Sequence, residues 1–205
     1  MSAVQGTPEW LAERAGCCTA SRFSDVLATI KTGESASRRN YRAQLVAERL
    51  TGQPAESFTS KEMEWGSAQE PFARMAYEAR SGLMVMEHGF IRHPTLPFTG
   101  CSPDGFVGED GGFECKCPNT ATHIETLLKG MPPGHIPQIQ GSMWITGRAW
   151  WDFASFDPRM PERLQLYVFR VVRDEAYIKN LEAEVVKFLA SVALTVKELE
   201  ALSNG

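Results

Sequence analysis

The sequence predicts a single α/β domain in which helices flank a central mixed β-sheet. The chain has 205 residues, 43% of them hydrophobic, which is enough to bury one well-packed core. Helical patterns come first, a run of strand patterns follows, and helices, two strands and a last helix complete an order typical of mixed α/β folds. No internal repeat or Pro/Gly/Ser-rich linker divides the chain, so residues 1–205 are expected to form one domain.

The first elements are expected to be helices. Residues 19–30 carry apolar side chains on one helical face, and residues 31–39 are polar and Gly-containing, which indicates a loop. A second helix is expected over residues 41–50, with Gly52 in the position that a C-terminal cap favours. The apolar face of the first helix consists of Phe23, Val26, Leu27 and Ile30.

A longer helix is expected to run towards Ala79. Residues 59–62 (Thr-Ser-Lys-Glu) have the form of a capping box, which marks the start of a helix. Pro71 lies inside this helix and lacks the N–H that the helix needs, so a kink or a break is expected just after Glu70.

From residue 83 the pattern changes to that of strands. Three strands separated by Pro- or Gly-containing turns are expected over residues 83–92, 98–107 and 112–117. The remaining elements are expected as helix, helix, strand, strand and helix over residues 120–130, 135–146, 150–156, 164–172 and 174–202.

The charge of the chain argues against diffuse coating of DNA or membranes. Lys plus Arg number 21 and Asp plus Glu number 25, which gives a formal charge of −4 and little general attraction for a polyanion. Residues 31–49 differ, because five basic residues there face two acidic ones, a net of +3. This excess is expected to contact phosphates, unless it is only a solvated helix face. The basic residues are Lys31, Arg38, Arg39, Arg42 and Arg49.

The cysteines and the N-terminus predict a cytoplasmic protein. The five cysteines are an odd number without a C-x-x-C pair, which argues against a disulfide framework. No apolar run approaches the roughly 18 residues of a membrane span, and residues 1–10 lack the basic start and apolar core of a signal peptide. We therefore expect reduced cysteines that fill buried space.

Residues around a short hairpin carry the chemistry. Alternate side chains of a strand share a face, so Glu114 and Lys116 point to one side while Phe113 and Cys115 point to the core. A hairpin would bring Asp104 beside this acid–base pair. Two carboxylates that converge with a lysine suit a hard divalent cation, Mg²⁺ or Mn²⁺, which would activate water against a phosphate ester. The residue types alone leave open a surface ion pair, worth at most about 1 kcal/mol.

Several motifs in a fixed order narrow the interpretation. Asp104, Glu114 and Lys116 match the PD-(D/E)xK nuclease signature. The surrounding motifs are Trp65-Gly66-x-x-x-Glu70, Cys101-Ser102-Pro103-Asp104-Gly105, Glu114-x-Lys116-Cys117-Pro118, Gln138-x-Gln140-x-Ser142-Met143-Trp144 and Asp157-Pro158-Arg159-Met160. Over nearly the whole chain they resemble the lambda exonuclease family, the YqaJ-type viral recombinases, which implies a restriction-endonuclease-like core.

The resemblance implies a Mg²⁺-dependent deoxyribonuclease, with Mn²⁺ able to substitute, that digests one strand of linear duplex DNA in the 5′→3′ direction. It would prefer 5′-phosphorylated ends and leave a 3′ single strand for a single-strand annealing protein. The family also forms homotrimeric rings, and three copies could enclose a duplex despite the acidic charge. A phage or prophage origin in a bacterial cytoplasm fits this role.

The resemblance also implies roles for single residues. Asp104, Glu114 and the backbone carbonyl of Cys115 would be the metal ligands, and Lys116 would be the catalytic lysine. Gln138 would help to position the attacking water. Without the resemblance, that glutamine is an ordinary amide on an amphipathic helix.

Further matches concern a second ion and the DNA end. Glu70 would lie at the metal site and serve a second ion, whereas Arg14, Ser21 and Ser102 would hold the 5′-phosphate. Without the resemblance, the arginine and the glutamate are solvated surface residues. The family's loop near the duplex corresponds to a basic segment that includes Arg38, Arg39 and Arg42. The chain begins close to Trp10, so further end-binding residues upstream are expected to be missing.

Two other functions remain open at this stage. An endonuclease or nickase could use the same core, and it would cut closed circular DNA that an exonuclease leaves intact. A recombination scaffold with an inactive site is the other, although all five polar residues of the expected site are present. Iron–sulfur nucleases are disfavoured, because no cysteine follows Cys117.

Overall fold

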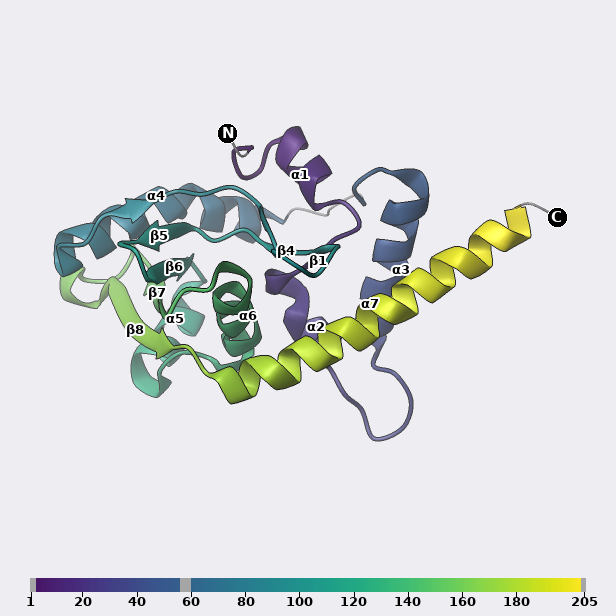
Figure 1. The fold of residues 1–205 in the computed structure, drawn as a ribbon. Helices are drawn as coiled ribbons and strands as arrows, with labels where there is room; N and C mark the ends of the chain where they lie inside the picture. Colours follow the sequence, from purple (N-terminus) through teal and green to yellow (C-terminus); the bar gives the residue numbers. More distant parts are fainter. Residues whose placement is uncertain (1–2, 56–59, 204–205) are drawn as a thin grey trace.

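A five-stranded mixed sheet forms the centre of the protein. The computed structural model describes residues 3–55 and 60–203 (Figure 1). The strand order is β2-β5-β6-β7-β8, and within it only β6 and β7 are parallel. The strands are β2 (Val85–Met86), β5 (Gly105–Val107), β6 (Gly111–Lys116), β7 (Trp150–Phe156) and β8 (Leu166–Val172).

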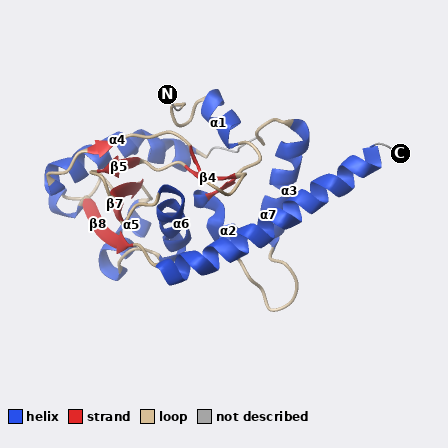
Figure 2. Ribbon diagram, viewed as in Figure 1, coloured by secondary structure: helices blue, strands red, loops and turns tan. Residues whose placement is uncertain are grey.

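Helices cover both faces of this sheet (Figure 2). On one face, Phe113 and Cys115 of β6 pack against helix α4 (Lys61–Ser81). On the other face, Trp151 and Phe153 of β7 pack against helix α6 (Ile136–Thr146). Helix α5 (Thr120–Lys129) contacts β7, and short 3₁₀ turns span η2 (Pro133–His135) and η3 (Glu162–Leu164).

Two glycines of β6 allow β7 to lie close. A Cβ on Gly111 would come within 2.1 Å of the Trp150 ring, and one on Gly112 within 2.2 Å of the Trp151 ring. A side chain at either position would therefore require the tryptophan ring to move. The two glycines let both rings pack on β6, next to the parallel pairing that places Glu114 beside Phe153.

A second, three-stranded sheet lies beside the first. Its order is β1-β4-β3, and it packs with four helices around a separate apolar cluster that includes Phe23, Tyr41, Leu181 and Phe188. The strands are β1 (Cys18–Thr19), β3 (Ile91–Arg92) and β4 (Thr99–Cys101). The helical elements of this part are α1 (Pro8–Arg14), η1 (Ala20–Arg22), α2 (Phe23–Leu27), α3 (Ala36–Thr51) and α7 (Glu175–Ser203). The four helices around the cluster are α2, α3, α7 and the C-terminal part of α6.

The expected fold class is confirmed, with corrections at single elements. The segments 83–92 and 98–107 are each divided between the two sheets instead of forming one strand. Thr19 belongs to β1, and Ile30 lies beyond α2 with 54% of its surface exposed, so the first helix is shorter than expected. Within the described residues, no helix is long and apolar enough to cross a membrane.

Helix boundaries agree better, with exceptions at the start of α3 and at Pro71. Helix α3 begins at Ala36, capped by the Ser35 hydroxyl, so residues 36–39 are helical and not part of the expected loop. Gly52 caps α3 in the left-handed conformation, at φ 66°, as expected. At the start of α4 the Ser60 hydroxyl accepts from the Met63 N–H, whereas Thr59 lies outside the described residues. The expected break after Glu70 is wrong, because α4 continues through Pro71 to Ser81.

Candidate active site

Glu114 lies at the centre of a polar cluster at the end of β6. The residue is buried, with 2% of its surface exposed, so it is not part of a surface ion pair. The Lys116 ammonium and the Gln138 amide nitrogen both donate to its Oε1, each at 2.6 Å. Its other oxygen, Oε2, is buried without a hydrogen-bond partner among the described residues. A buried carboxylate oxygen without a donor is costly unless a cation occupies that side.

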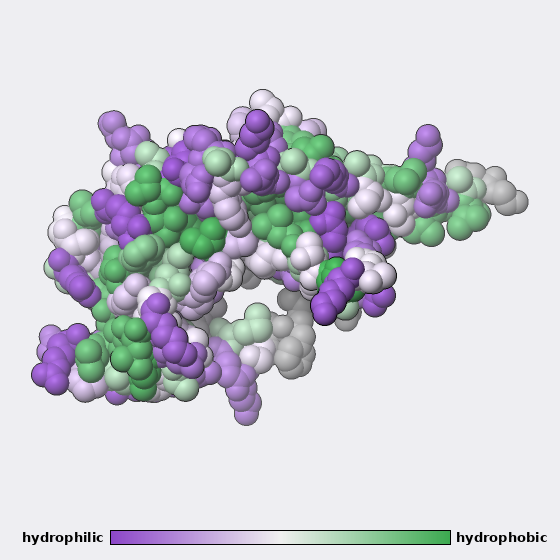
Figure 3. Space-filling view, turned by 90° about the horizontal axis from the view of Figure 1, so that it is seen from below, coloured by the Kyte–Doolittle hydropathy of each residue, from purple (hydrophilic) through white to green (hydrophobic). Residues whose placement is uncertain are grey.

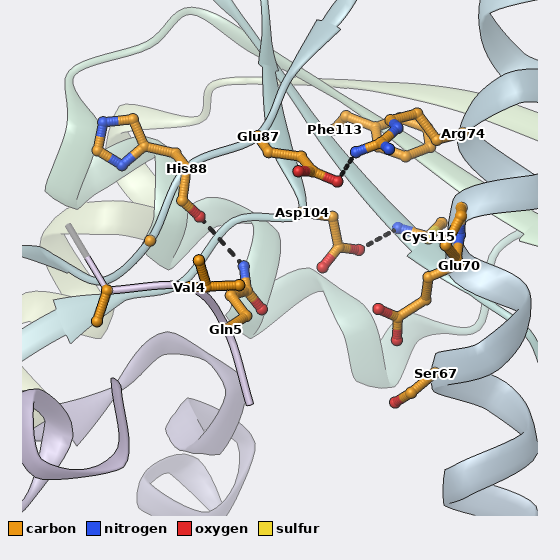
Figure 4. A pocket seen from close by; sticks show the side chains of 13 residues that line it. Val4, Gln5, Ser67, Glu70, Arg74, Glu87, His88, Asp104, Phe113 and Cys115 are labelled. Carbon is orange, nitrogen blue, oxygen red and sulfur yellow. Dashed lines mark hydrogen bonds and ion pairs between the residues drawn. The ribbon is translucent and has the colours of Figure 1, made fainter. Parts of the chain in front are cut away.

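Asp104 is brought to Glu114 by the β5–β6 hairpin. The last residue pair of that hairpin is Gly105 with Phe113, so the residues beyond it lie opposite each other. Past this point the Cys115 N–H donates to Asp104 Oδ2 at 2.7 Å (Figure 4). The hairpin predicted from the sequence therefore does place two carboxylates side by side.

Glu70 reaches the same region from helix α4. In Figure 4 the carboxylates of Glu70 and Asp104 both point into a cavity of about 400 Å³. Ser67, Arg74 and Phe113 line the same cavity, and the Arg74 guanidinium forms an ion pair with Glu87. The cavity is therefore open to a ligand on the α4 side of the carboxylates.

The charges of these groups are strongly coupled. Burial and the neighbouring Glu114 carboxylate raise the pKa of Asp104 to about 8. Burial also raises the pKa of Glu70, and the Glu114 charge adds to this effect. Burial favours the neutral amine of Lys116, but the Glu114 and Asp104 carboxylates outweigh it and raise its pKa, so the lysine stays protonated. Without a cation, the Asp104 carboxyl is therefore largely protonated at neutral pH, and the charged pair at the centre of the cluster is Lys116 with Glu114.

The donor set fits a hard divalent cation. Within the described residues, no three His, Cys, Asp or Glu side chains gather closely enough to hold a metal by themselves. Mg²⁺ does not need such a cage, because it keeps several waters and usually takes one or two carboxylates. Asp104 and the unpartnered oxygen of Glu114 provide that number. Oxygen donors without a thiolate or imidazole favour Mg²⁺ or Mn²⁺ over zinc.

A second polar group surrounds Ser102, which lies two residues before Asp104 in the chain. Arg14 and the Trp10 indole both donate to Ser102 Oγ, at 2.9 and 3.1 Å, and the guanidinium of Arg14 stacks on Trp10 at 4.0 Å. The structure thus brings Arg14 and Ser102 together as expected. Ser21 is exposed, and its hydroxyl bonds to Thr19.

The basic residues of α3 are mostly engaged within the protein. Arg42 pairs with Glu34 at 2.9 Å, and Arg38 lies 3.7 Å from the same carboxylate and 3.9 Å from Glu184 of α7. Arg39 is exposed. Because α3 packs on α2 and α7, the structure does not bring these arginines into the carboxylate cluster.

The structure adds residues that the sequence did not indicate. His135 stacks on Phe153, with ring centroids 5.0 Å apart, and burial and the Lys116 charge lower its pKa to about 4, so it is neutral. Gln5, upstream of α1, donates to the carbonyl of Pro103, next to Asp104. Neither residue has a local pattern that could have identified it, because both act through contacts distant in sequence.

Comparisons with known proteins point to one family. The family model described as YqaJ-like viral recombinase domain matches residues 9–149. The protein ExoD of Escherichia coli (strain K12) is 32% identical over 72 residues, which are 35% of this chain and 82% of that protein.

Solved structures show the same similarity. The alkaline exonuclease LHK-Exo from Laribacter hongkongensis is 44% identical, covering 97% of this chain and 98% of its own, with a TM-score of 0.89. Its complex with dAMP superposes with a TM-score of 0.91 at the same identity and coverage. A phage-related exonuclease from Haemophilus somnus 129PT shares the fold at 16% identity and a TM-score of 0.73, over 89% of this chain and 96% of its own.

Proposed function

Because the chain belongs to the YqaJ-like viral recombinase family, we infer that it is a Mg²⁺-dependent 5′→3′ exonuclease acting on linear duplex DNA. The family and the alkaline exonuclease relatives make it a DNA nuclease with a role in recombination. The finer proposal is that it removes mononucleotides from one strand and leaves a 3′ single strand for an annealing protein. A bacterial cytoplasm, where phage recombination takes place, is the proposed compartment.

One observation carries the proposal: the buried Glu114 accepts from both Lys116 and Gln138 on one oxygen and has no donor on the other. That oxygen and Asp104 would hold the cation, and the Cys115 carbonyl would complete the set. Bound Mg²⁺ would supply Lewis acidity to the phosphate and lower the pKa of a water. Glu70, on the other wall of the cavity, would serve a second ion.

The chain's own residues provide the remaining chemistry. Water attacks the phosphorus and loses a proton to solvent, and the bond from phosphorus to the 3′-oxygen of the terminal nucleotide breaks. The leaving 3′-oxygen takes up a proton from solvent, which releases a 5′-mononucleotide with a 3′-hydroxyl. The Lys116 ammonium offsets the negative charge that develops on the phosphate oxygens, and the Gln138 amide fixes the carboxylate beside the attacking water. The new strand end carries a 5′-phosphate, so the same chemistry can repeat.

The group at Ser102 would select the DNA end. A guanidinium and a hydroxyl together suit a terminal phosphate, because both can donate to its oxygens. Burial lowers the pKa of Arg14, but the group remains protonated. The relative LHK-Exo has been solved with dAMP, a 5′-mononucleotide of the kind this reaction would release.

The decisive experiment uses linear duplex DNA with a 5′-phosphate and a separate label on each strand. We expect mononucleotides from the 5′-ended strand in Mg²⁺ and none in EDTA, while the complementary strand survives. Closed circular duplex is the control, and it should remain intact. Cleavage of the circle would favour the endonuclease alternative, and loss of label from the 3′ end first would contradict the proposed polarity.

We also propose a ring-shaped homotrimer. The C-terminal end of α7 projects beyond the body of the protein (Figure 1) and displays apolar side chains (Figure 3). Its exposed apolar residues include Leu194, Leu199 and Leu202. Apolar surface of this kind supports contact with other copies of the chain.

A further inference from the structure

The segment before α1 holds the loop of residues 102–104. This loop carries Ser102 of the proposed end-phosphate group and Asp104 of the carboxylate cluster. The Gln5 carboxamide nitrogen donates to the Pro103 carbonyl at 2.7 Å and to the His88 carbonyl at 3.3 Å. His88 lies between β2 and β3, and Figure 4 shows its bond with Gln5. One side chain therefore joins the segment before α1 to two separate loops. Val4 and Gln5 also form one wall of the cavity into which Asp104 points.

Three consecutive residues of this loop are each held by a different element. The Ser102 hydroxyl accepts from α1, the Pro103 carbonyl accepts from Gln5, and the Asp104 carboxylate accepts from β6. Proline has no N–H, so its carbonyl is the one backbone group through which hydrogen bonds can hold Pro103. Gln5 uses that group.

The loop also passes from one sheet to the other. β4 belongs to the three-stranded sheet and β5 to the five-stranded sheet, and residues 102–104 connect them. Ser102 and Asp104 are two residues apart, a span of at most about 7 Å. This is the scale of one nucleotide, so the position of the loop sets how a strand whose end is bound at Ser102 aligns with the carboxylates.

We propose that Gln5 is a positioning residue that fixes the distance between the end-phosphate group at Ser102 and the carboxylate at Asp104. This inference rests on the proposed exonuclease function. With the loop held, a 5′-phosphate bound at Ser102 places the next phosphodiester at the carboxylates. Without Gln5, the end phosphate still binds, but its binding no longer aligns the bond to be cut.

The test uses Gln5→Met, which keeps the length of the side chain and removes the donor, and Gln5→Glu, which replaces the donor with acceptors. Gln53→Met, at an exposed glutamine in the loop after α3, is the matched control. In Mg²⁺, we expect the ratio of digestion rates on 5′-phosphate and 5′-hydroxyl ends to fall at least about fivefold in both Gln5 variants. Affinity for the phosphorylated end, measured by fluorescence anisotropy in EDTA, should change less than about twofold.

A second readout does not depend on activity. The amide of Cys115 is protected by Asp104, so its hydrogen exchange in the metal-free protein should be faster in the Gln5 variants, with the melting temperature unchanged. The Gln53 control should match the parent in every measurement.

The outcomes separate the two proposals. If the parent protein fails to digest the phosphorylated duplex, the proposed function is wrong. If the parent digests it and the Gln5 variants keep its phosphate-dependent rate ratio, the positioning role is wrong. Unchanged exchange at Cys115 in an active protein would also contradict that role.

Discussion

At the scale of single residues, Glu114 organises the site. It is buried, and the two groups that bond to it come from its own strand and from α6. A buried charge that loses its partner is strongly destabilised, so the lysine and the carboxylate depend on each other. The same pairing keeps Lys116 protonated, which is the form needed to offset charge on a phosphate.

Replacing Lys116 should therefore remove cleavage but not DNA binding. In Lys116→Met, which keeps the length of the side chain, we expect the digestion rate to fall at least about 100-fold, because the ammonium is lost. End binding in EDTA should stay within about twofold of the parent. Lys129→Met, at an exposed lysine of α5, is the control. A Lys116 variant with near-normal turnover would contradict the mechanism.

The raised pKa of Asp104 makes stability and metal binding depend on pH. In an unfolded chain this carboxyl ionises near pH 4, whereas burial and Glu114 raise its pKa to about 8 in the folded, metal-free protein. Between these values the folded state holds a proton that the unfolded chain has lost, so stability falls as pH rises through this window. Metal ligation needs the ionised form, so Mg²⁺ affinity should rise up to about pH 8.

This prediction can be tested by thermal unfolding in EDTA. Asp104→Asn should raise the melting temperature by at least ~4 °C at about pH 8.5 and by less at about pH 5. Glu109→Gln, at an exposed glutamate in the β5–β6 turn, should leave both values unchanged. An Asp104→Asn gain that is equal at the two pH values would show that ionisation is not the cause.

Arg14 should control the preference for phosphorylated ends. In Arg14→Ala, the guanidinium that bonds to Ser102 is lost, so the affinity for a 5′-phosphate end should fall about tenfold while that for a 5′-hydroxyl end changes little. Arg163→Ala, at an exposed arginine far in sequence from the basic segment, is the control. Equal digestion of both kinds of end by the parent would refute a phosphate site at this place.

At the scale of elements, Arg159 connects the segments that carry the site. It stacks on Trp65 of α4 at 4.1 Å, donates to the Pro118 carbonyl after β6 at 3.1 Å, and bonds to Asp157 after β7. Asp157 is 0% exposed and also accepts from Thr120 at 2.6 Å. Burial alone would raise the pKa of Asp157, but the bonds from Arg159 and Thr120 hold it below its ordinary value.

Removing this arginine should destabilise the protein. Arg159→Ala leaves the buried carboxylate with fewer donors, so we expect unfolding free energy to fall by about 1–3 kcal/mol in urea titrations. Because the Asp157 pKa is lowered in the folded state, its contribution is present above about pH 4 and is lost at lower pH. Arg163→Ala, nearby and exposed, should have little effect. A smaller loss for Arg159 than for Arg163 would contradict this account.

The sequence predicted the helices and strands that have a clear periodicity of their own. It did not predict features that depend on contacts with distant residues, such as the sheet that a short strand joins. β7 was predicted over its full length, and the alternation of β6 correctly separated Glu114 from the core. Periodicity cannot show which sheet a short strand joins, so segments 83–92 and 98–107 were each taken as one strand. Pro71 does not break α4, because the acceptor it frees is the carbonyl of the exposed Ser67, which water can reach.

The candidate site was partly predictable for the same reason. Asp104, Glu114 and Lys116 stand within one hairpin and could be placed from alternation, whereas the contact of Gln138 with Glu114 spans 24 residues and came from the family resemblance. The pairing of Arg38 and Arg42 with Glu34 was not foreseen, because charge counting treats basic residues as free.

At the scale of the whole molecule, the acidic net charge gives little general attraction for DNA, so the shape of the assembly would have to hold the duplex. A chain of net charge −4 gains little from the DNA backbone, so under the proposed ring the duplex would be retained through enclosure by several copies. Light scattering at micromolar concentration should give three times the mass of one chain. The mass of a monomer under these conditions would contradict the ring. A monomer should also release the DNA after every few nucleotides, because nothing would enclose the duplex.

The division of the cluster among α4, β6 and α6 has a consequence for the cell that makes the protein. A nascent chain that has emerged from the ribosome as far as Gln138 already contains every polar residue of the cluster. It still lacks β7, which pairs with β6, and α7, which packs on α2, α3 and α6. We therefore expect the chain to have no nuclease activity until β7 and α7 have been translated and packed.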